Sequence, residues 1–103
     1  KSKAEVNLQD ELGFIALHEA ALYGHCETAE LLLKSKAEVN LQNEKGYSAL
    51  LWAAANGHSE TAELLLKSKA EVNLQTKNGN TALGLALLYG RQSVAQVLKD
   101  ARA

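Results

Sequence analysis

Three histidines and a single cysteine are the side chains of this sequence best suited to metal binding or nucleophilic catalysis. His25 and Cys26 are adjacent, and imidazole and thiolate groups are ligands that zinc prefers. A structural zinc site needs further ligands, and no Cys-x-x-Cys or His-x-x-x-His pair supplies them. Catalysis by Cys26 would also need a neighbouring base and an oxyanion site. The sequence therefore predicts no metal site, no cofactor and no enzymatic activity.

The same positions recur along the chain, which favours structural roles for these residues. His25 and His58 lie 33 residues apart, and Cys26 is replaced at that spacing by Ser59 and then by Gln92. The glycines recur as well and form neither of the phosphate-binding patterns GxGxxG and GxxxxGK[ST]. We interpret the histidines as residues that make structural hydrogen bonds in or near turns.

The charge balance argues against several classes of partner. Eleven Lys and Arg residues face twelve Asp and Glu residues, which gives a net charge of −1 with neutral histidines. A nucleic-acid-binding chain or a membrane-surface segment usually has a basic excess. The longest apolar run, residues 49–55, is far shorter than the roughly 20 residues of a membrane span. With one cysteine and no visible secretory leader, we expect an intracellular protein, cytoplasmic or nuclear, that binds neither nucleic acid nor membrane.

An internal repeat organises the whole chain. The string KSKAEVNLQ begins at residues 1, 34 and 67, and the 16-residue block 27–42 recurs unchanged as 60–75. We therefore expect one repeat domain over residues 1–103, made of the tail of a preceding unit and three further units: 1–9, 10–42, 43–75 and 76–103.

Each unit has the local signals of two short helices. Residues 15–23 are rich in Ala and Leu and end at Gly24, which suits a left-handed helix cap. Residues 26–34 carry Glu early and Lys late, as the helix dipole favours. The polar stretch 35–46 is predicted to form an extended, hairpin-like loop. Because one such unit cannot bury its apolar faces alone, the units are expected to stack.

These features resemble the ankyrin repeat family over the whole chain. The family's Thr-Pro-Leu-His-x-Ala-Ala motif is similar to residues 15–21, 48–54 and 81–87, and the Gly-His step recurs at residues 24–25 and 57–58. The resemblance implies an all-α solenoid of stacked helix-turn-helix units with hairpin-like loops. It also implies a non-catalytic module that binds another protein across the concave surface of loop tips and first helices.

Several residues depart from the family pattern. Lys36 and Lys69 stand where the family usually has glycine, so we expect strained left-handed backbone there. Ile15 replaces a helix-capping Thr or Ser, and Gly84 lies inside a predicted helix. Such flaws argue against an idealised consensus design, although the unchanged block fits recent duplication and engineering equally well.

The two ends of the chain are expected to differ. Lys99 stands where Leu33 and Leu66 stand in the earlier units, which suits the outer face of a C-terminal capping unit. Residues 1–9 are expected to be the remnant of a unit trimmed from a longer array. The first complete unit is therefore expected to expose some apolar surface.

The resemblance and the variation between units indicate the same binding surface. The units 10–42 and 43–75 differ at nine positions, all within residues 10–26 or their equivalents, whereas the rest of the second helix does not vary. Aromatic side chains, which are enriched at binding hot spots, map to the loop tips and first helices, although each could instead pack between units. The candidate partner-binding residues are Leu12, Phe14, Leu22, Tyr23, Lys45, Tyr47, Trp52, Asn56, Asn78, Asn80 and Tyr89.

Other functions remain open at the level of sequence. The chain could be a structural scaffold or an engineered repeat protein without a partner, or it could self-associate through its N-terminal face. The resemblance also implies that Asn40 and Asn73 are candidate substrates of an asparaginyl hydroxylase, since a leucine lies eight residues before each of them.

Overall fold

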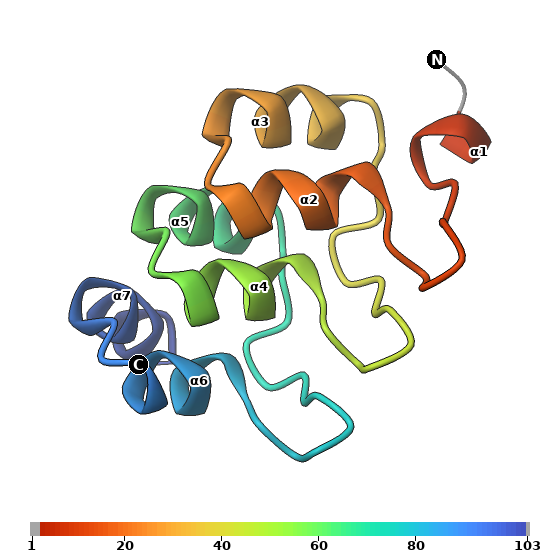
Figure 1. The fold of residues 1–103 in the computed structure, drawn as a ribbon. Helices are drawn as coiled ribbons and strands as arrows, with labels where there is room; N and C mark the ends of the chain where they lie inside the picture. Colours follow the sequence, from red (N-terminus) through yellow and green to blue (C-terminus); the bar gives the residue numbers. More distant parts are fainter. Residues whose placement is uncertain (1–2, 103) are drawn as a thin grey trace.

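The computed structural model describes residues 3–102 of the chain (Figure 1). Within this part the chain forms helices and loops without a strand, so the predicted all-α class is confirmed. Lys1, Ser2 and Ala103, which belong to the predicted first and last segments, lie outside the described residues. The helices are α1 (Lys3–Val6), α2 (Ala16–Tyr23), α3 (Cys26–Lys34), α4 (Ala49–Asn56), α5 (Ser59–Lys67), α6 (Ala82–Leu88) and α7 (Gln92–Arg102).

The helices stack in two layers. The first layer consists of α2, α4 and α6, and the second consists of α3, α5 and α7, with contacts between successive members of each layer (Figure 1). The loops that precede α2, α4 and α6 extend from one side of the stack, with tips at residues 10–14, 43–47 and 76–80. This arrangement confirms the predicted solenoid of helix-turn-helix units with projecting loops.

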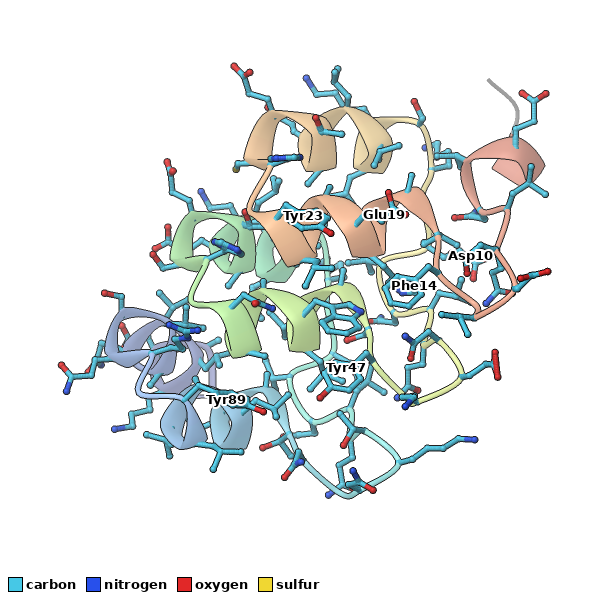
Figure 2. The ribbon with its side chains drawn as sticks, in the orientation of Figure 1. Asp10, Phe14, Glu19, Tyr23, Tyr47 and Tyr89 are labelled. Carbon is cyan, nitrogen blue, oxygen red and sulfur yellow. The ribbon has the colours of Figure 1, made fainter. Side chains whose placement is uncertain are left out.

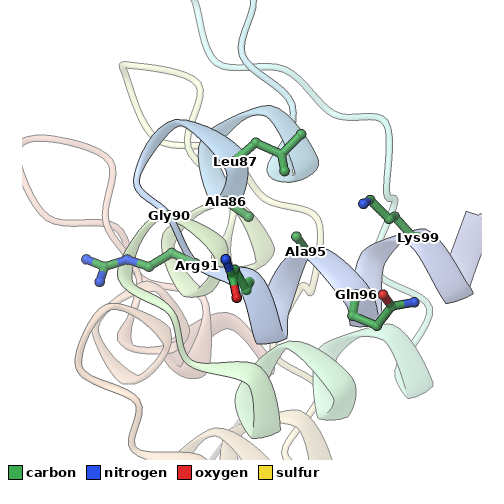
Figure 3. A pocket seen from close by; sticks show the side chains of 8 residues that line it. Ala86, Leu87, Gly90, Arg91, Ala95, Gln96 and Lys99 are labelled. Atoms are coloured by element: carbon green, nitrogen blue, oxygen red, sulfur yellow. The ribbon is translucent and has the colours of Figure 1, made fainter.

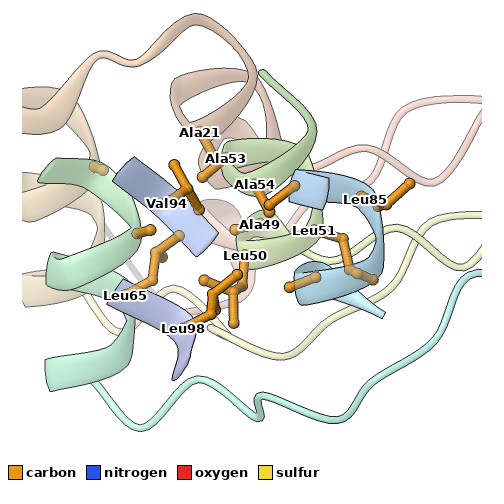
Figure 4. Packing of buried hydrophobic residues seen from close by; sticks show 14 of the residues in the cluster. Ala21, Ala49, Leu50, Leu51, Ala53, Ala54, Leu65, Leu85, Val94 and Leu98 are labelled. Atoms are coloured by element: carbon orange, nitrogen blue, oxygen red, sulfur yellow. The ribbon is translucent and has the colours of Figure 1, made fainter. Parts of the chain in front are cut away.

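Alanine sets the spacing of the first layer. Ala20, Ala21, Ala53, Ala54 and Ala86 are buried between its helices. Their short side chains let the helix backbones approach closely, while larger leucine side chains fill the space toward the second layer (Figure 4). The largest fully buried aliphatic residues of the two layers and the adjoining loops are Ile15, Leu17, Leu50, Leu51, Leu65, Leu85 and Leu98.

Side-chain oxygens close the loop tips. Asp10 Oδ1 accepts hydrogen bonds from the amides of Leu12 and Phe14, each at 2.9 Å. Asn43 Oδ1 makes the equivalent pair of bonds in the second loop, at 3.0 and 2.9 Å. Backbone bonds then join neighbouring tips: the Glu44 amide donates to the Leu12 carbonyl at 3.2 Å, and the next pair of tips is joined in the same way. Backbone hydrogen bonds therefore connect the three loop tips in a continuous row along one side of the stack.

The left-handed backbone expected at two lysines is confirmed. Lys36 and Lys69 have φ angles of 74° and 76°. In the first case the amides of Lys36 and Ala37 turn back to the carbonyls of Leu33 and Leu32, at 3.1 and 3.0 Å. The chain therefore satisfies the last carbonyls of α3 at the cost of placing a side chain where glycine fits better.

The first residues differ from their copies downstream. Residues 3–6 form the single turn α1, whereas the identical residues 36–39 follow α3 and start with a left-handed lysine. The turn at Lys36 is stabilised by hydrogen bonds to the last carbonyls of α3. Among the described residues, no helix precedes α1 that could accept the equivalent bonds. From Asn7 onward the pattern of the other units returns, since Asn7 and Asn40 both bridge to the following unit.

Candidate partner-binding surface

A shallow hollow of about 310 Å³ lies between the first loop tip and α2. Figure 2 shows four of its labelled side chains, Asp10, Phe14, Glu19 and Tyr23, around this part of the molecule. We call this hollow the first-unit pocket; it is lined by Asp10, Leu12, Phe14, Glu19, Leu22 and Tyr23. Of these six residues, all but the acidic Asp10 and Glu19 belong to the set predicted for partner binding.

Three of the predicted aromatic residues form a stack that crosses two units. The Trp52 ring lies between Tyr47, at a centroid distance of 4.2 Å and an interplanar angle of 24°, and Phe14, at 5.5 Å and 30°. All three side chains are half-buried, and the indole Nε1 of Trp52 has no hydrogen-bond partner among the described residues. Much of their ring surface therefore packs between units, while the remainder contributes to the outer surface.

The other predicted residues differ in accessibility. Leu12, Tyr23 and Tyr89 are 59%, 64% and 54% exposed, and Lys45 and Asn78 are exposed as well. Leu22, Asn56 and Asn80 are half-buried, and Asn56 donates a hydrogen bond to the Trp52 carbonyl at 2.9 Å. Tyr89 lies at the end of α6, away from the first-unit pocket (Figure 2). The predicted residues thus form a band along the stack rather than one compact patch.

The sequence analysis missed two groups of residues. Asp10 and Glu19 line the first-unit pocket, and the replacement of Glu19 by Trp52 in the next unit was the available signal. A second hollow of about 440 Å³ lies between α6 and α7 (Figure 3). Its lining includes exposed Leu87, at a position where the earlier units have buried alanine. The complete lining is Ala86, Leu87, Gly90, Arg91, Gln92, Ala95, Gln96 and Lys99.

His18 is a buried structural residue. Its Nδ1 accepts a hydrogen bond from the Ile15 amide at 3.1 Å, and its Nε2 lies 2.7 Å from the Leu41 carbonyl. These two bonds require the neutral ring with the proton on Nε2. Burial lowers the pKa of His18 below its ordinary value, although the Leu41 carbonyl and the charge of Asp10 act in the opposite direction. The ring thus satisfies the backbone amide of Ile15, the residue just before α2.

His58 joins two units. Its Nε2 donates to the Leu22 carbonyl at 3.0 Å, and in the next unit Arg91 Nε donates to the equivalent carbonyl of Ala55 at the same distance. The His58 ring lies so close to Gly24 that a Cβ on that residue would stand 2.5 Å from Nδ1. This position therefore connects neighbouring units, whichever of the two side chains occupies it.

Cys26 and His25 are the remaining side chains considered for metal binding or catalysis. Cys26 is a free, half-buried thiol, and the exposed His25 ring lies 5.9 Å from the Tyr23 ring. In the part of the chain that the structure describes, no three His, Cys, Asp or Glu side chains gather as metal ligands. None of the helices in the described range has the length and apolar character needed to cross a membrane.

The family follows from a comparison with known proteins. A family model of ankyrin repeats in three copies matches residues 17–103. The chain belongs to the ankyrin repeat family. Ankyrin repeats are generally protein–protein interaction modules and are typically not enzymes. No curated protein matches this ankyrin repeat chain.

The ankyrin fold places the two predicted hydroxylation sites in different surroundings. Asn40 is half-buried; its Oδ1 accepts from the Glu71 amide at 2.8 Å, and its Nδ2 donates to the Lys69 carbonyl at 3.4 Å. Asn73 is exposed. A modifying enzyme would have to break the bonds between two units to reach Asn40, whereas the side chain of Asn73 is accessible.

Proposed function

We propose that this chain binds a partner protein across its front surface, which comprises the loop tips 10–14, 43–47 and 76–80, the helices α2, α4 and α6, and Tyr89 at the end of α6. The strongest support is the exposure of large apolar side chains there: Leu12, Tyr23 and Tyr89 each leave more than half of their surface in water. Burying such apolar surface against a partner would stabilise the complex by about 25 cal/mol per Å². A band of this kind is typical of a protein contact.

The front surface is also preorganised for binding. Hydrogen bonds join the tips to one another, and the first-layer helices pack through buried alanine. A partner that docks there would order few flexible groups of this chain, so little of the contact energy would be spent on lost conformational freedom. No catalytic step is part of the proposal.

The proposal is tested with a partner captured from a cell lysate and then purified. Its affinity is measured for the wild type, for a front variant with Leu12→Ala, Tyr23→Ala and Tyr89→Ala, and for the control Leu31→Ala. Leu31 is 66% exposed but lies on α3 in the second layer. We expect the front variant to bind at least about tenfold more weakly and the control to bind as the wild type does. Equal losses in both variants, or none in the front variant, would refute the proposal.

Two alternatives predict other results. A scaffold without a partner would capture nothing specific. Self-association through the N-terminal face is favoured by the exposure of Leu8 and Leu31, at 70% and 66%. Sedimentation at rising concentration would then show dimers that disappear with Leu31→Ala.

The free, half-buried thiol of Cys26 fits the reducing cytoplasm or nucleus, which we propose as the compartment.

A further inference from the structure

The second unit shows what the first-unit pocket is shaped to hold. Phe14 and Tyr47 occupy equivalent positions in neighbouring loop tips, as do Glu19 and Trp52 on the following helices. In the second unit the planar indole of Trp52 stacks on Tyr47 at 4.2 Å and 24°. In the first unit a carboxylate stands at the indole's position, and a hollow of about 310 Å³ is left beside the Phe14 ring. The first-unit pocket therefore offers space for a planar group at the place where the next unit stacks its own.

The charge of this pocket selects among planar groups. Asp10 and Glu19 bring two carboxylates to the lining, and none of the six lining residues is cationic. The equivalent residues of the second unit, Asn43 and Trp52, are uncharged. Asp10 uses Oδ1 for the Leu12 and Phe14 amides, which are neutral donors, so its negative charge is not cancelled. The two carboxylates therefore favour a cationic occupant, and the space beside the Phe14 ring favours a planar one.

We propose that the first-unit pocket binds the guanidinium group of an arginine side chain on the partner protein. A guanidinium is planar, permanently charged and weakly hydrated, so it can stack on the Phe14 or Tyr23 ring while it donates paired hydrogen bonds to Glu19. The ammonium of lysine has no plane to stack. This inference rests on the proposed function, because it names the chemistry of the partner at one end of the front surface.

The charges of the loop tips support one orientation of the partner. The first tip carries Asp10 and Glu11, the second carries Glu44 and Lys45, and the third carries Lys77. The front surface thus changes from acidic at the first unit to basic at the third. A partner with complementary charges would place its arginine over the first unit and its acidic residues over the third.

The test uses N-acetyl-arginine N-methylamide as the probe, titrated into the ¹⁵N-labelled full chain and followed by amide chemical shifts. The citrulline analogue has the same shape without the charge, and the lysine analogue has the charge without the plane. The variant Asp10→Asn copies Asn43, whose Oδ1 makes the same two amide bonds, so the loop is expected to fold. It is combined with Glu19→Gln, and Glu44→Gln in the second tip is the matched control.

We expect the arginine probe to shift amides of residues 10–23, and the citrulline and lysine probes to bind at least about tenfold more weakly. The double variant should lose the response, while Glu44→Gln should keep it. Shifts that are absent, equally strong with citrulline, or unchanged in the double variant would overturn the inference.

The purified partner separates this inference from the proposed function. If the double variant Asp10→Asn, Glu19→Gln bound the partner as tightly as the wild type while the front variant did not, the arginine pocket would be wrong and the front surface would still stand. A loss of affinity of about tenfold in the double variant, with Glu44→Gln unaffected, supports the arginine pocket.

Discussion

At the scale of single residues, two histidines that could have been catalytic or metal-binding instead stabilise the fold through hydrogen bonds to backbone carbonyls. His18 uses Nε2 to bond the Leu41 carbonyl within its own unit at 2.7 Å, and His58 uses Nε2 to bond the Leu22 carbonyl of the preceding unit at 3.0 Å. His18 is buried and neutral, so its hydrogen bonds depend on its protonation state. Its contribution to stability should therefore depend on pH.

We predict that the free energy of unfolding falls as the pH drops below the ordinary histidine pKa of about 6.5. Burial lowers the pKa of His18 in the folded chain, so the unfolded chain binds the proton first and is stabilised by it. The stability is complete above about pH 6.5 and is lost as the pH falls through the lower folded pKa. Thermal melts between neutral and mildly acidic pH measure the effect. The variant His18→Leu, which copies Leu51 of the next unit, should reduce it; an identical pH dependence in both proteins would contradict the role of His18.

The strained lysines lead to a second prediction. Lys36→Gly and Lys69→Gly should each raise the melting temperature, because a side chain at positive φ costs about 1–2 kcal/mol and the added freedom of unfolded glycine offsets only about half of that. Glu30→Gly, at an exposed position in the middle of α3, should instead destabilise by about 1 kcal/mol. If all three variants melted at lower temperature, the left-handed strain at Lys36 and Lys69 would be disproved.

The two asparagines should differ as substrates. We predict that an asparaginyl hydroxylase adds oxygen to Asn73 before Asn40, because the bonds of Asn40 to Lys69 and Glu71 tie two units together. Peptide mass spectrometry over time would follow both sites. Faster modification of Asn40 would contradict the predicted order, and no added oxygen at either residue would exclude both asparagines as substrates.

At the scale of elements, the turns between paired helices hold neighbouring units in register. Gly24 has a φ of 70° and lies under the His58 ring, whereas Gly90 has a φ of 69° with open space beside it. We predict that Gly24→Ala lowers the free energy of unfolding by at least about 1 kcal/mol more than Gly90→Ala, because only the former also displaces His58. Chemical denaturation of both variants measures the difference. Equal losses would show that the His58 contact adds nothing to the stability.

At the scale of the whole molecule, the period of 33 made the fold predictable, since unchanged copies can bury their apolar faces only on one another. The candidate site was predictable in part. Leu12 and Tyr23 were found because they vary between units, but the first-unit pocket depends on where Glu19 lies relative to Phe14, which no spacing reveals. The stack of Trp52 between residues of two units is likewise a property of the folded solenoid.

The most direct test of the central claim is amide hydrogen exchange of the chain with and without its purified partner. The front surface predicts added protection in residues 10–23, 43–56 and 76–89, which contain the loop tips and α2, α4 and α6. It predicts no added protection in the outer residues of α3, α5 and α7. Protection confined to this second layer would contradict the account and place the contact on the opposite side of the stack.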